Sequence, residues 1–323
     1  MTSMELFPGA HEYLVRQMTW EADDVVSVVL VNPDGREMPA WTLGAHIDLI
    51  LRPDLIRQYS LCSDPTDRSK WTIAILREPN SGGGSRFIHE VLRPGMTIAA
   101  GDPRNNFPLV EAAHYLFVAG GIGVTPLLPM VLALQETGRD WTMLYGGRRR
   151  ASMAFLDQLG PLGNVTIAPE DEFGLLDLKG AIESTPDDTA IYCCGPEPLI
   201  AALEAQCERS GRSAPHVERF NARPSFAAET HEGENAEFEL VLAKSGRRFT
   251  IPADKTIIQV LSAERVFVAT SCTEGYCGVC ETAVLEGIPD HRDDYLLPEV
   301  RDTNKRIMVC CSRSKTPELV IDL

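Results

Sequence analysis

The chain has 323 residues, of which 44% are hydrophobic and 24% are charged. These fractions exclude a disordered chain, which buries too little apolar surface to offset its ordering entropy. No run of 18 apolar residues is present, so no membrane-spanning helix is expected, and residues 1–11 show no secretory signal. The net charge of −16 disfavours nucleic acid and anionic membranes as partners, because both repel an acidic chain.

The first part of the chain, residues 1–108, is predicted to form an antiparallel β-barrel. Short apolar and β-branched runs separated by turn residues are typical of barrels and sandwiches. The glycine-rich stretch 81–85 precedes an expected helix over 86–91, and a helix start after such a loop can cradle a phosphate. The expected strands cover residues 25–31, 46–51, 58–61 and 71–76.

The second part, residues 109–228, alternates between strand and helix patterns. Such alternation predicts an α/β domain, with a parallel sheet covered by helices on both faces. The expected strands are 115–119, 141–145, 165–168 and 190–194, and the expected helices are 127–134, 155–159 and 198–209.

The third part, residues 229–323, begins in a polar segment over 227–235 that is predicted to be an interdomain linker. Two strands, a helix, a cysteine-rich loop and a closing strand are expected after it. They cover residues 238–242, 248–251, 256–264, 271–280 and 319–323.

The cysteine-rich loop predicts an iron–sulfur centre. With no export signal, clustered cysteines are better explained as metal ligands than as disulfides. The loop glycines Gly275 and Gly278 allow the backbone to wrap closely and bring its amides near sulfur. The spacing C-x4-C-x2-C followed by a distant cysteine is that of plant-type [2Fe–2S] ferredoxins, and it selects Cys272, Cys277, Cys280 and Cys310.

Two alternatives remain at this loop. Structural zinc also takes four thiolates, although zinc loops usually pair two short C-x2–4-C units. Cys311 competes with Cys310 for the fourth position. If the two lie on a strand they point to opposite faces, so only one of them is expected to bind.

A glycine turn follows the expected strand 115–119 and predicts a dinucleotide site. Gly120, Gly121 and Gly123 permit a tight turn and close approach of a pyrophosphate. Thr125 is expected to N-cap the following helix, with Pro126 at its first position. The helix would then direct its N-terminus at the anionic ligand.

A second turn of this kind, Cys194-Gly195-Pro196, follows the strand 190–194. Ligands of open α/β sheets bind at such carboxyl strand ends, so Cys194 is expected beside a nicotinamide, while Cys193 packs in the core. After the strand 141–145 no ribose-binding acid is present, and Arg148-Arg149-Arg150 stands there instead. An arginine there favours NADPH, so the residues alone leave the choice of nicotinamide open.

Taken together, these segments resemble the phthalate dioxygenase reductase and vanillate demethylase reductase family, within the ferredoxin–NADP reductase superfamily. The flavin motif R-x-Y-S matches Arg57, Tyr59 and Ser60, and the nicotinamide motifs match Gly121–Pro126 and Cys194–Pro196. Further family-like segments lie at residues 57–62, 83–85, 217–220, 290–293 and 308–310.

The resemblance implies a flavin barrel, a nicotinamide domain and an α+β ferredoxin (β-grasp) domain, with FMN, NADH and one [2Fe–2S] cluster as cofactors. It implies Cys310 rather than Cys311 as the fourth ligand. Phe220 is expected against the flavin where nicotinamide must enter. The residues expected to bind FMN or the nucleotide are Arg57, Gln58, Tyr59, Ser60, Gly83, Gly84, Ser85, Gly120, Gly121, Gly123, Thr125, Arg148, Cys194, Gly195, Pro196 and Phe220.

The function implied is that of a reductase component of a Rieske-type oxygenase system, in aromatic catabolism, which hands electrons to a separate terminal oxygenase. A stand-alone NAD(P)H-dependent reductase of a ferric chelate or quinone is the alternative, and a zinc-stabilised binding protein is a third. The protein is expected to be a cytoplasmic monomer with no obligatory catalytic acid or base. Asp290, Asp293 and Asp294 are considered as contacts for the oxygenase, or as a solvated turn.

Overall fold

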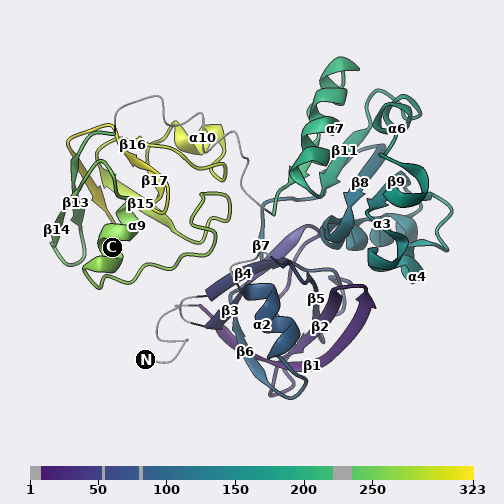
Figure 1. The fold of residues 1–323 in the computed structure, drawn as a ribbon, viewed down its shortest axis with the longest axis horizontal. Coiled ribbons are helices and arrows are strands. Elements are labelled where there is room, and N and C mark those ends of the chain that lie inside the picture. The colour runs from purple at the N-terminus through teal and green to yellow at the C-terminus, as the bar shows by residue number, and fades with distance from the viewer. Residues whose placement is uncertain (1–8, 53–54, 80–82, 221–234) are drawn as a thin grey trace. The chain divides into compact units, whose positions relative to one another are not determined.

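The computed structural model describes residues 9–52, 55–79, 83–220 and 235–323. They form two compact units, Met1–Arg219 and Phe220–Leu323 (Figure 1). The first unit contains an antiparallel and a parallel sheet, and the second contains its own five-stranded sheet. The expected boundary at 228/229 and the linker residues 227–234 lie outside the described residues, whereas 108/109 falls between the two sheets of the first unit.

Seven antiparallel strands make the barrel of the first unit, in the order β4-β3-β6-β1-β2-β5, with β7 paired to β3. A bridge between Leu61 and Ile73 brings the end of β4 to β5 and closes the sheet. The elements are β1 (His11–Ala22), β2 (Val25–Val31), β3 (Ala45–Arg52), β4 (Leu55–Ser60), β5 (Trp71–Leu76), α2 (Gly84–Glu90), β6 (Thr97–Ala100) and β7 (Arg104–Asn105).

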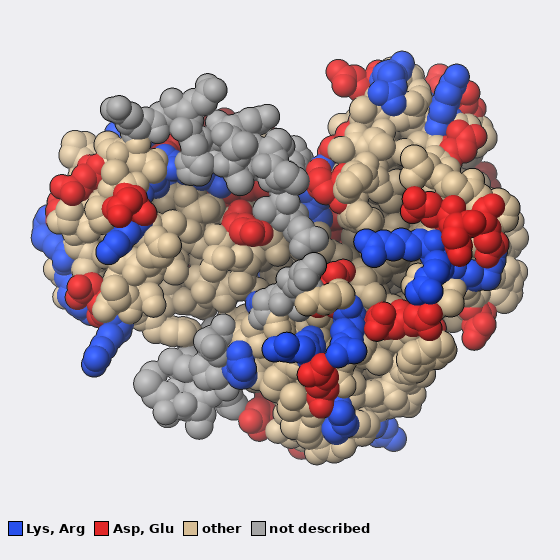
Figure 2. Space-filling model, viewed as in Figure 1, with Lys and Arg blue, Asp and Glu red and all other residues tan. Residues whose placement is uncertain are grey.

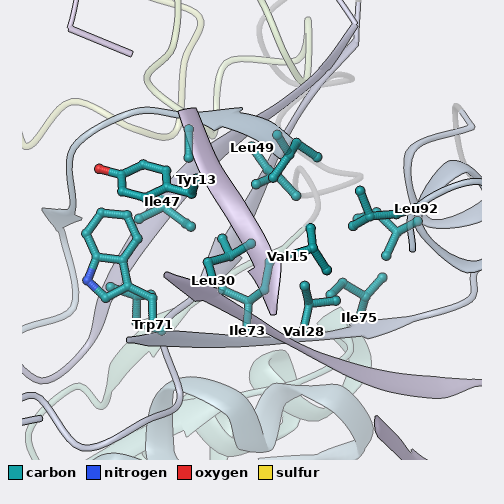
Figure 3. Packing of buried hydrophobic residues seen from close by; sticks show 14 of the residues in the cluster. Tyr13, Val15, Val28, Leu30, Ile47, Leu49, Trp71, Ile73, Ile75 and Leu92 are labelled. Atoms are coloured by element: carbon teal, nitrogen blue, oxygen red, sulfur yellow. The ribbon is translucent and has the colours of Figure 1, made fainter. Parts of the chain in front are cut away.

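Alternate residues of these strands fill the barrel with apolar side chains (Figure 3). The rings of Tyr13 and Trp71 pack 4.8 Å apart between their centroids, and the Trp71 indole nitrogen donates to the carbonyl of Pro39. Such a closely packed apolar interior holds the strands in place, so residues at the rim of the barrel are fixed in position.

The parallel sheet has the strand order β10-β9-β8-β11-β12. Because β8 is flanked by β9 and β11, the chain reverses its winding direction there, and a ligand crevice is expected at the carboxyl ends of β8 and β11. The elements are β8 (His114–Gly120), η1 (Gly121–Gly123), α3 (Val124–Thr137), β9 (Asp140–Gly147), η2 (Arg150–Ser152), α4 (Leu156–Leu159), β10 (Val165–Pro169), α5 (Glu170–Phe173), α6 (Leu178–Glu183), β11 (Ala190–Cys194), α7 (Glu197–Arg209) and β12 (His216–Glu218).

One face of this sheet packs against α6 and α7. Leu116, Val118 and Cys193 from the strands meet Ile182 of α6 and Leu203 of α7 in one buried cluster. This confirms Cys193 as a core thiol. Helix α3 also packs on β8, β9 and β11.

The second unit is a mixed sheet in the order β14-β13-β19-β15-β17, with a two-stranded ribbon of β16 and β18. Helix α9 opens with a capping box, in which Thr256 and Gln259 satisfy each other's backbone amides. The elements are β13 (Phe238–Leu242), β14 (Arg248–Ile251), α9 (Ile257–Ala263), β15 (Glu281–Glu286), β16 (Pro289–Asp290), α10 (Pro298–Arg301), β17 (Arg306–Met308), β18 (Arg313–Ser314) and β19 (Glu318–Ile321).

On the face drawn in Figure 2, basic and acidic side chains are interspersed over both units. This face therefore carries no broad basic stripe of the kind that follows a nucleic-acid backbone. Among the described helices, none combines the length and apolar character needed to cross a membrane.

Candidate cofactor sites

Strand β4 carries the predicted flavin residues and is held in register by β3, with Gln58 opposite Asp48 and Ser60 opposite His46. The Gln58 amide donates to Asp48 Oδ1 at 3.0 Å, and Arg104 donates to Asp48 Oδ2 at 2.6 Å. The polar residues at this rim of the barrel are thus braced by a hydrogen-bonded network.

Arg57 lies directly against the start of α2. A Cβ atom placed on Gly84 would come within 2.4 Å of Arg57 Cγ, so only glycine leaves room for the arginine stem. Gly83 precedes the helix at a φ of +87°, in the left-handed region that favours glycine. The buried Ser85 hydroxyl accepts a hydrogen bond from the Glu78 amide at 3.1 Å. The structure therefore joins the two flavin segments, while residues 81 and 82 of the loop lie outside the described residues.

The two nicotinamide turns meet through their backbones at the carboxyl ends of β8 and β11. A Cβ atom on Gly123 would lie 2.2 Å from the carbonyl oxygen of Cys194, and one on Gly195 would lie 3.0 Å from Gly120. Gly121 has a φ of +55°. These glycines let the two turns pack directly on each other, which brings both strand ends together at the place where an open α/β sheet binds its ligand.

The prediction that Thr125 caps the helix is wrong. Helix α3 starts at Val124, two residues before the predicted first position at Pro126, and continues directly from the turn of η1. The Thr125 hydroxyl therefore lies inside the helix and donates to the carbonyl of Ile122 at 3.0 Å.

Glu218, at the end of β12, is a functional candidate that the sequence reasoning missed. Ser60 Oγ donates to Glu218 Oε2 at 3.3 Å, and His46 Nδ1 lies 4.0 Å from Oε1. Burial raises the pKa of Glu218 to about 8, opposed by the Ser60 hydrogen bond. Its only signal in the sequence was the family-like segment 217–220.

His46 is neutral beside Glu218. Burial lowers the pKa of His46 to about 4, aided by the Arg104 charge and opposed by Asp48. A neutral imidazole 4.0 Å from a carboxyl that titrates near pH 8 does not form an ion pair at neutral pH.

Cys194 is fully buried at the end of β11. Burial raises the pKa of its thiol well above the ordinary range, and the neighbouring Glu218 raises it further. The side chain therefore stays a neutral thiol next to the carboxyl of Glu218. Phe220 is partly buried and begins the second compact unit.

The three arginines after β9 differ in their pairing. Arg150 forms a two-pronged salt bridge with Glu172, and Arg149 lies 3.8 Å from Asp23 of the barrel. Arg148 is exposed and pairs with no carboxylate among the described residues. It is therefore the arginine at this strand end with a guanidinium open to a ligand.

In the second unit the four predicted ligand cysteines come together. Hydrogen bonds from the thiols of Cys277 and Cys310 lower the pKa of Cys272, and Cys310 also contacts Cys280. The amide of Glu274 approaches Cys272 Sγ at 3.4 Å, as expected for a loop that directs amides at sulfur.

These thiols fit a two-iron cluster, because each iron takes two of the four thiolates. Within the part of the chain that the structure describes, no group of three or more His, Cys, Asp or Glu side chains has the arrangement needed to hold a single metal ion.

The glycines of this loop are required by close neighbours. A Cβ atom on Gly278 would lie 2.2 Å from the Tyr295 ring, and one on Gly275 would lie 2.5 Å from Cys311 Sγ. Both have positive φ, at +75° and +81°. The loop is therefore shaped against the segment that contains Tyr295 as well as around a cluster.

Two expectations about this region are wrong. Cys310 and Cys311 do not alternate on a strand, because β17 ends at Met308 and both lie in the turn that follows. Asp293 cannot contact an oxygenase, because its side chain is completely buried. Asp290 is paired with Arg292, 2.7 Å away.

A rigid flavin-type barrel, a nicotinamide-type crevice and a four-cysteine loop define a flavin- and nicotinamide-dependent iron–sulfur oxidoreductase. Residues 240–315 match the family described as "2Fe-2S iron-sulfur cluster binding domain". The chain is 41% identical to phenoxybenzoate dioxygenase subunit beta of Ectopseudomonas oleovorans and 37% identical to tetrachlorobenzoquinone reductase of Sphingobium chlorophenolicum. The alignments cover 96% of this chain in both cases, and 96% and 97% of the relatives.

Among solved structures, phthalate dioxygenase reductase superposes over 100% of both chains with a TM-score of 0.73 and 33% identity. The chain belongs to the phthalate dioxygenase reductase and vanillate demethylase reductase family. This confirms the predicted fold class, the oxidoreductase activity, and FMN, NADH and a [2Fe–2S] cluster as cofactors.

Proposed function

We propose that this chain is the reductase component of an oxygenase system and delivers electrons to a separate terminal oxygenase. The observation that carries the proposal is the junction of Ser60 with Glu218, which joins a flavin barrel to a nicotinamide crevice in a chain that also holds a cluster-binding domain. Nicotinamide gives two electrons as a hydride and a [2Fe–2S] cluster takes one at a time, and bound FMN connects the two.

In this proposal the barrel residues hold FMN. Arg57 would neutralise the FMN phosphate, and Gly83, Gly84 and Ser85 would surround it at the start of α2. Gln58, Tyr59 and Ser60 would line the ring system. The packing of Arg57 on Gly84 supports this assignment, because it brings a guanidinium to the end of a glycine loop.

The crevice residues hold the nucleotide. Gly120, Gly121 and Gly123 would admit the pyrophosphate at the start of η1 and α3, with Thr125 shaping the turn from within the helix. Cys194, Gly195 and Pro196 would border the nicotinamide, with Phe220 at its entrance and Arg148 near the adenosine ribose. The backbone contact between the two turns supports this arrangement.

Glu218 is proposed to exclude water and to hold a proton at the boundary between flavin and nicotinamide. A carboxyl with a pKa of about 8 is mostly protonated at neutral pH and can donate as well as accept a hydrogen bond. No side chain needs to act as an obligatory acid or base for hydride transfer.

The proposed partner is a Rieske-type oxygenase that acts on an aromatic acid or a related small substrate, as the relative named phenoxybenzoate dioxygenase subunit beta suggests. The protein would be a cytoplasmic monomer that binds this partner transiently. None of the nine cysteines, all of which lie in the described part of the chain, forms a disulfide, which agrees with a reducing compartment.

Direct reduction of a quinone is the second candidate, favoured by the relative named tetrachlorobenzoquinone reductase. One experiment tests both. Anaerobic NADH is added to the full chain, the visible spectrum is recorded, and the reduced protein is mixed with either a purified Rieske oxygenase or a quinone. Bleaching of flavin and cluster followed by faster reoxidation with the oxygenase supports the first function. Reoxidation by the quinone alone supports the second, and a colourless protein contradicts both.

A further inference from the structure

Asp293 is a buried carboxylate directly behind the cysteine loop, and neither FMN nor the nucleotide explains it. Its side chain has 0% exposure. Oδ2 accepts a hydrogen bond from the Leu296 amide at 2.8 Å, and Oδ1 accepts one from the Ser312 hydroxyl at 3.5 Å. A carboxylate removed from water is unfavourable unless its surroundings compensate for the lost hydration.

One guanidinium and one imidazole lie near the Asp293 carboxylate. Arg301 Nη2 lies 3.8 Å from Oδ2, and His291 Nδ1 lies 3.6 Å from Oδ1. Both ring nitrogens of His291 are buried and without a hydrogen-bond partner among the described residues. The carboxylate therefore accepts hydrogen bonds from an amide and a hydroxyl, and forms one longer ion pair with Arg301.

Asp293 also packs against the backbone of the cysteine loop at Gly275. A Cβ atom on Gly275 would lie 2.9 Å from Asp293 Cα, and the Asp294 amide donates to the Gly275 carbonyl at 3.0 Å. Gly275 lies between two predicted cluster ligands, Cys272 and Cys277. Fixing Asp293 thus fixes the loop at its midpoint.

The Ser312 hydroxyl extends this link to the fourth ligand. It donates to Asp293, accepts from the Arg292 amide at 3.1 Å, and follows Cys310 by two residues. One carboxylate therefore connects the loop that holds three ligands with the turn that holds the fourth.

We propose that Asp293 is a positioning residue for the iron–sulfur cluster, which fixes Gly275 and Ser312 and places a buried negative charge behind the cluster loop. Groups outside the ligand set orient the ligands and tune the centre that they hold. Reduction adds one negative charge to the cluster, so a fixed carboxylate nearby opposes reduction and a fixed guanidinium favours it.

The test is an anaerobic redox titration of the cluster in the full holoprotein, followed by visible and electron paramagnetic resonance spectra. Asp293→Asn keeps the shape and removes the charge. It should raise the ratio of reduced to oxidised cluster about tenfold at a fixed potential, equivalent to about 59 mV for one electron. Arg301→Gln should shift the ratio in the opposite direction, because it removes a positive charge beside the same carboxylate.

Asp290→Asn is the matched control. It removes a carboxylate three positions away that pairs with Arg292, and it should change the ratio less than threefold. An unchanged potential in Asp293→Asn, or shifts in the same direction for Asp293→Asn and Arg301→Gln, overturns the proposal.

Cluster loss is also informative. If Asp293→Asn loses the cluster while circular dichroism shows the second unit folded, the positioning role is supported. If the unit unfolds as well, the carboxylate serves the fold alone and the proposal fails. The cluster potential is measured without an oxygenase, so an unchanged potential would not contradict the proposed partner.

Discussion

Ser60 and Glu218 are 158 positions apart in the chain, yet the serine hydroxyl donates to the glutamate carboxyl at 3.3 Å. The serine ends β4 of the barrel and the glutamate ends β12 of the parallel sheet. The bond therefore joins the ends of two strands from different sheets, at the proposed boundary between flavin and nicotinamide. Burial of the Glu218 carboxyl raises its pKa to about 8, although the Ser60 hydrogen bond opposes this shift.

The raised pKa of Glu218 predicts a pH-dependent stability. Between the ordinary value of 4.5 and about 8, the folded protein holds a proton that the unfolded chain has released. Stability contributed by this group is therefore fully present below about pH 4.5 and is lost as pH rises through about 8. Glu218→Gln should remove this slope, so that the difference in unfolding free energy from wild type changes by on the order of 4 to 5 kcal/mol across the range.

Urea unfolding of both holoproteins at several pH values between 5 and 9 measures this difference. Glu172→Gln serves as a control, because Glu172 is exposed and its pKa is lowered by Arg150. Parallel stability curves for wild type and Glu218→Gln would show that the carboxyl titrates normally.

Arg57→Ala should weaken FMN binding by about 10- to 100-fold, because a hydrogen bond to a charged phosphate contributes roughly 1.5–3 kcal/mol. The flavin content after gel filtration measures the loss. Arg77→Ala is the matched control, since Arg77 pairs with Glu90 on the exposed side of the same barrel. Equal flavin retention in the two variants would refute the role of Arg57.

Gly123→Ala should damage the nucleotide site while leaving FMN in place. The new methyl group would meet the Cys194 carbonyl at 2.2 Å and force the two turns apart. We expect the KM for NADH to rise at least about tenfold, since small displacements of positioning groups have large kinetic effects. Gly163→Ala is the control, because nothing lies within 4 Å of its Cβ position. A normal KM in Gly123→Ala would exclude this turn from nucleotide binding.

Much of this organisation was predictable because strong local patterns coincide with the elements. The expected strands 25–31, 71–76, 190–194, 238–242 and 248–251 have the bounds found in the structure. Strand β1, however, was missed: irregular register between Val15 and Gln17, and between Trp20 and Ala22, interrupts its alternation. Such shifts break the alternation of apolar and polar residues by which a strand is predicted from the sequence.

The site was predictable where chemistry is local and not where it depends on folding. The cysteine spacing predicts the cluster site, and the glycine turns predict the nucleotide site, each from residues that lie close together in the sequence. Glu218 acquires its role only from Ser60 and His46 of the other sheet, and β12 has just three residues. The burial of Asp293 likewise follows from the fold, because its acidic segment alone indicates a solvated turn.

Cys277→Ser should stop electron delivery to cytochrome c while NADH still bleaches the flavin, because the barrel and the cysteine loop belong to separate compact units. Stopped-flow spectra with NADH, followed by a cytochrome c assay, measure the two steps. Loss of flavin reduction in this variant would argue against a modular transfer path.

For the fourth ligand, Cys310→Ser should lose the cluster and Cys311→Ser should retain it, measured as iron per chain.

Arg148→Ala tests the choice of nicotinamide. Arg149 and Arg150 face Asp23 and Glu172, whereas Arg148 pairs with no carboxylate among the residues described. A guanidinium at this strand end would bind the 2′-phosphate that distinguishes NADPH from NADH. The variant should therefore lower kcat/KM for NADPH about tenfold and leave that for NADH within about twofold, while Arg150→Ala changes neither ratio strongly. Equal losses with both nucleotides would assign Arg148 to a part of the ligand that they share, and no loss with either would make it a solvated surface residue.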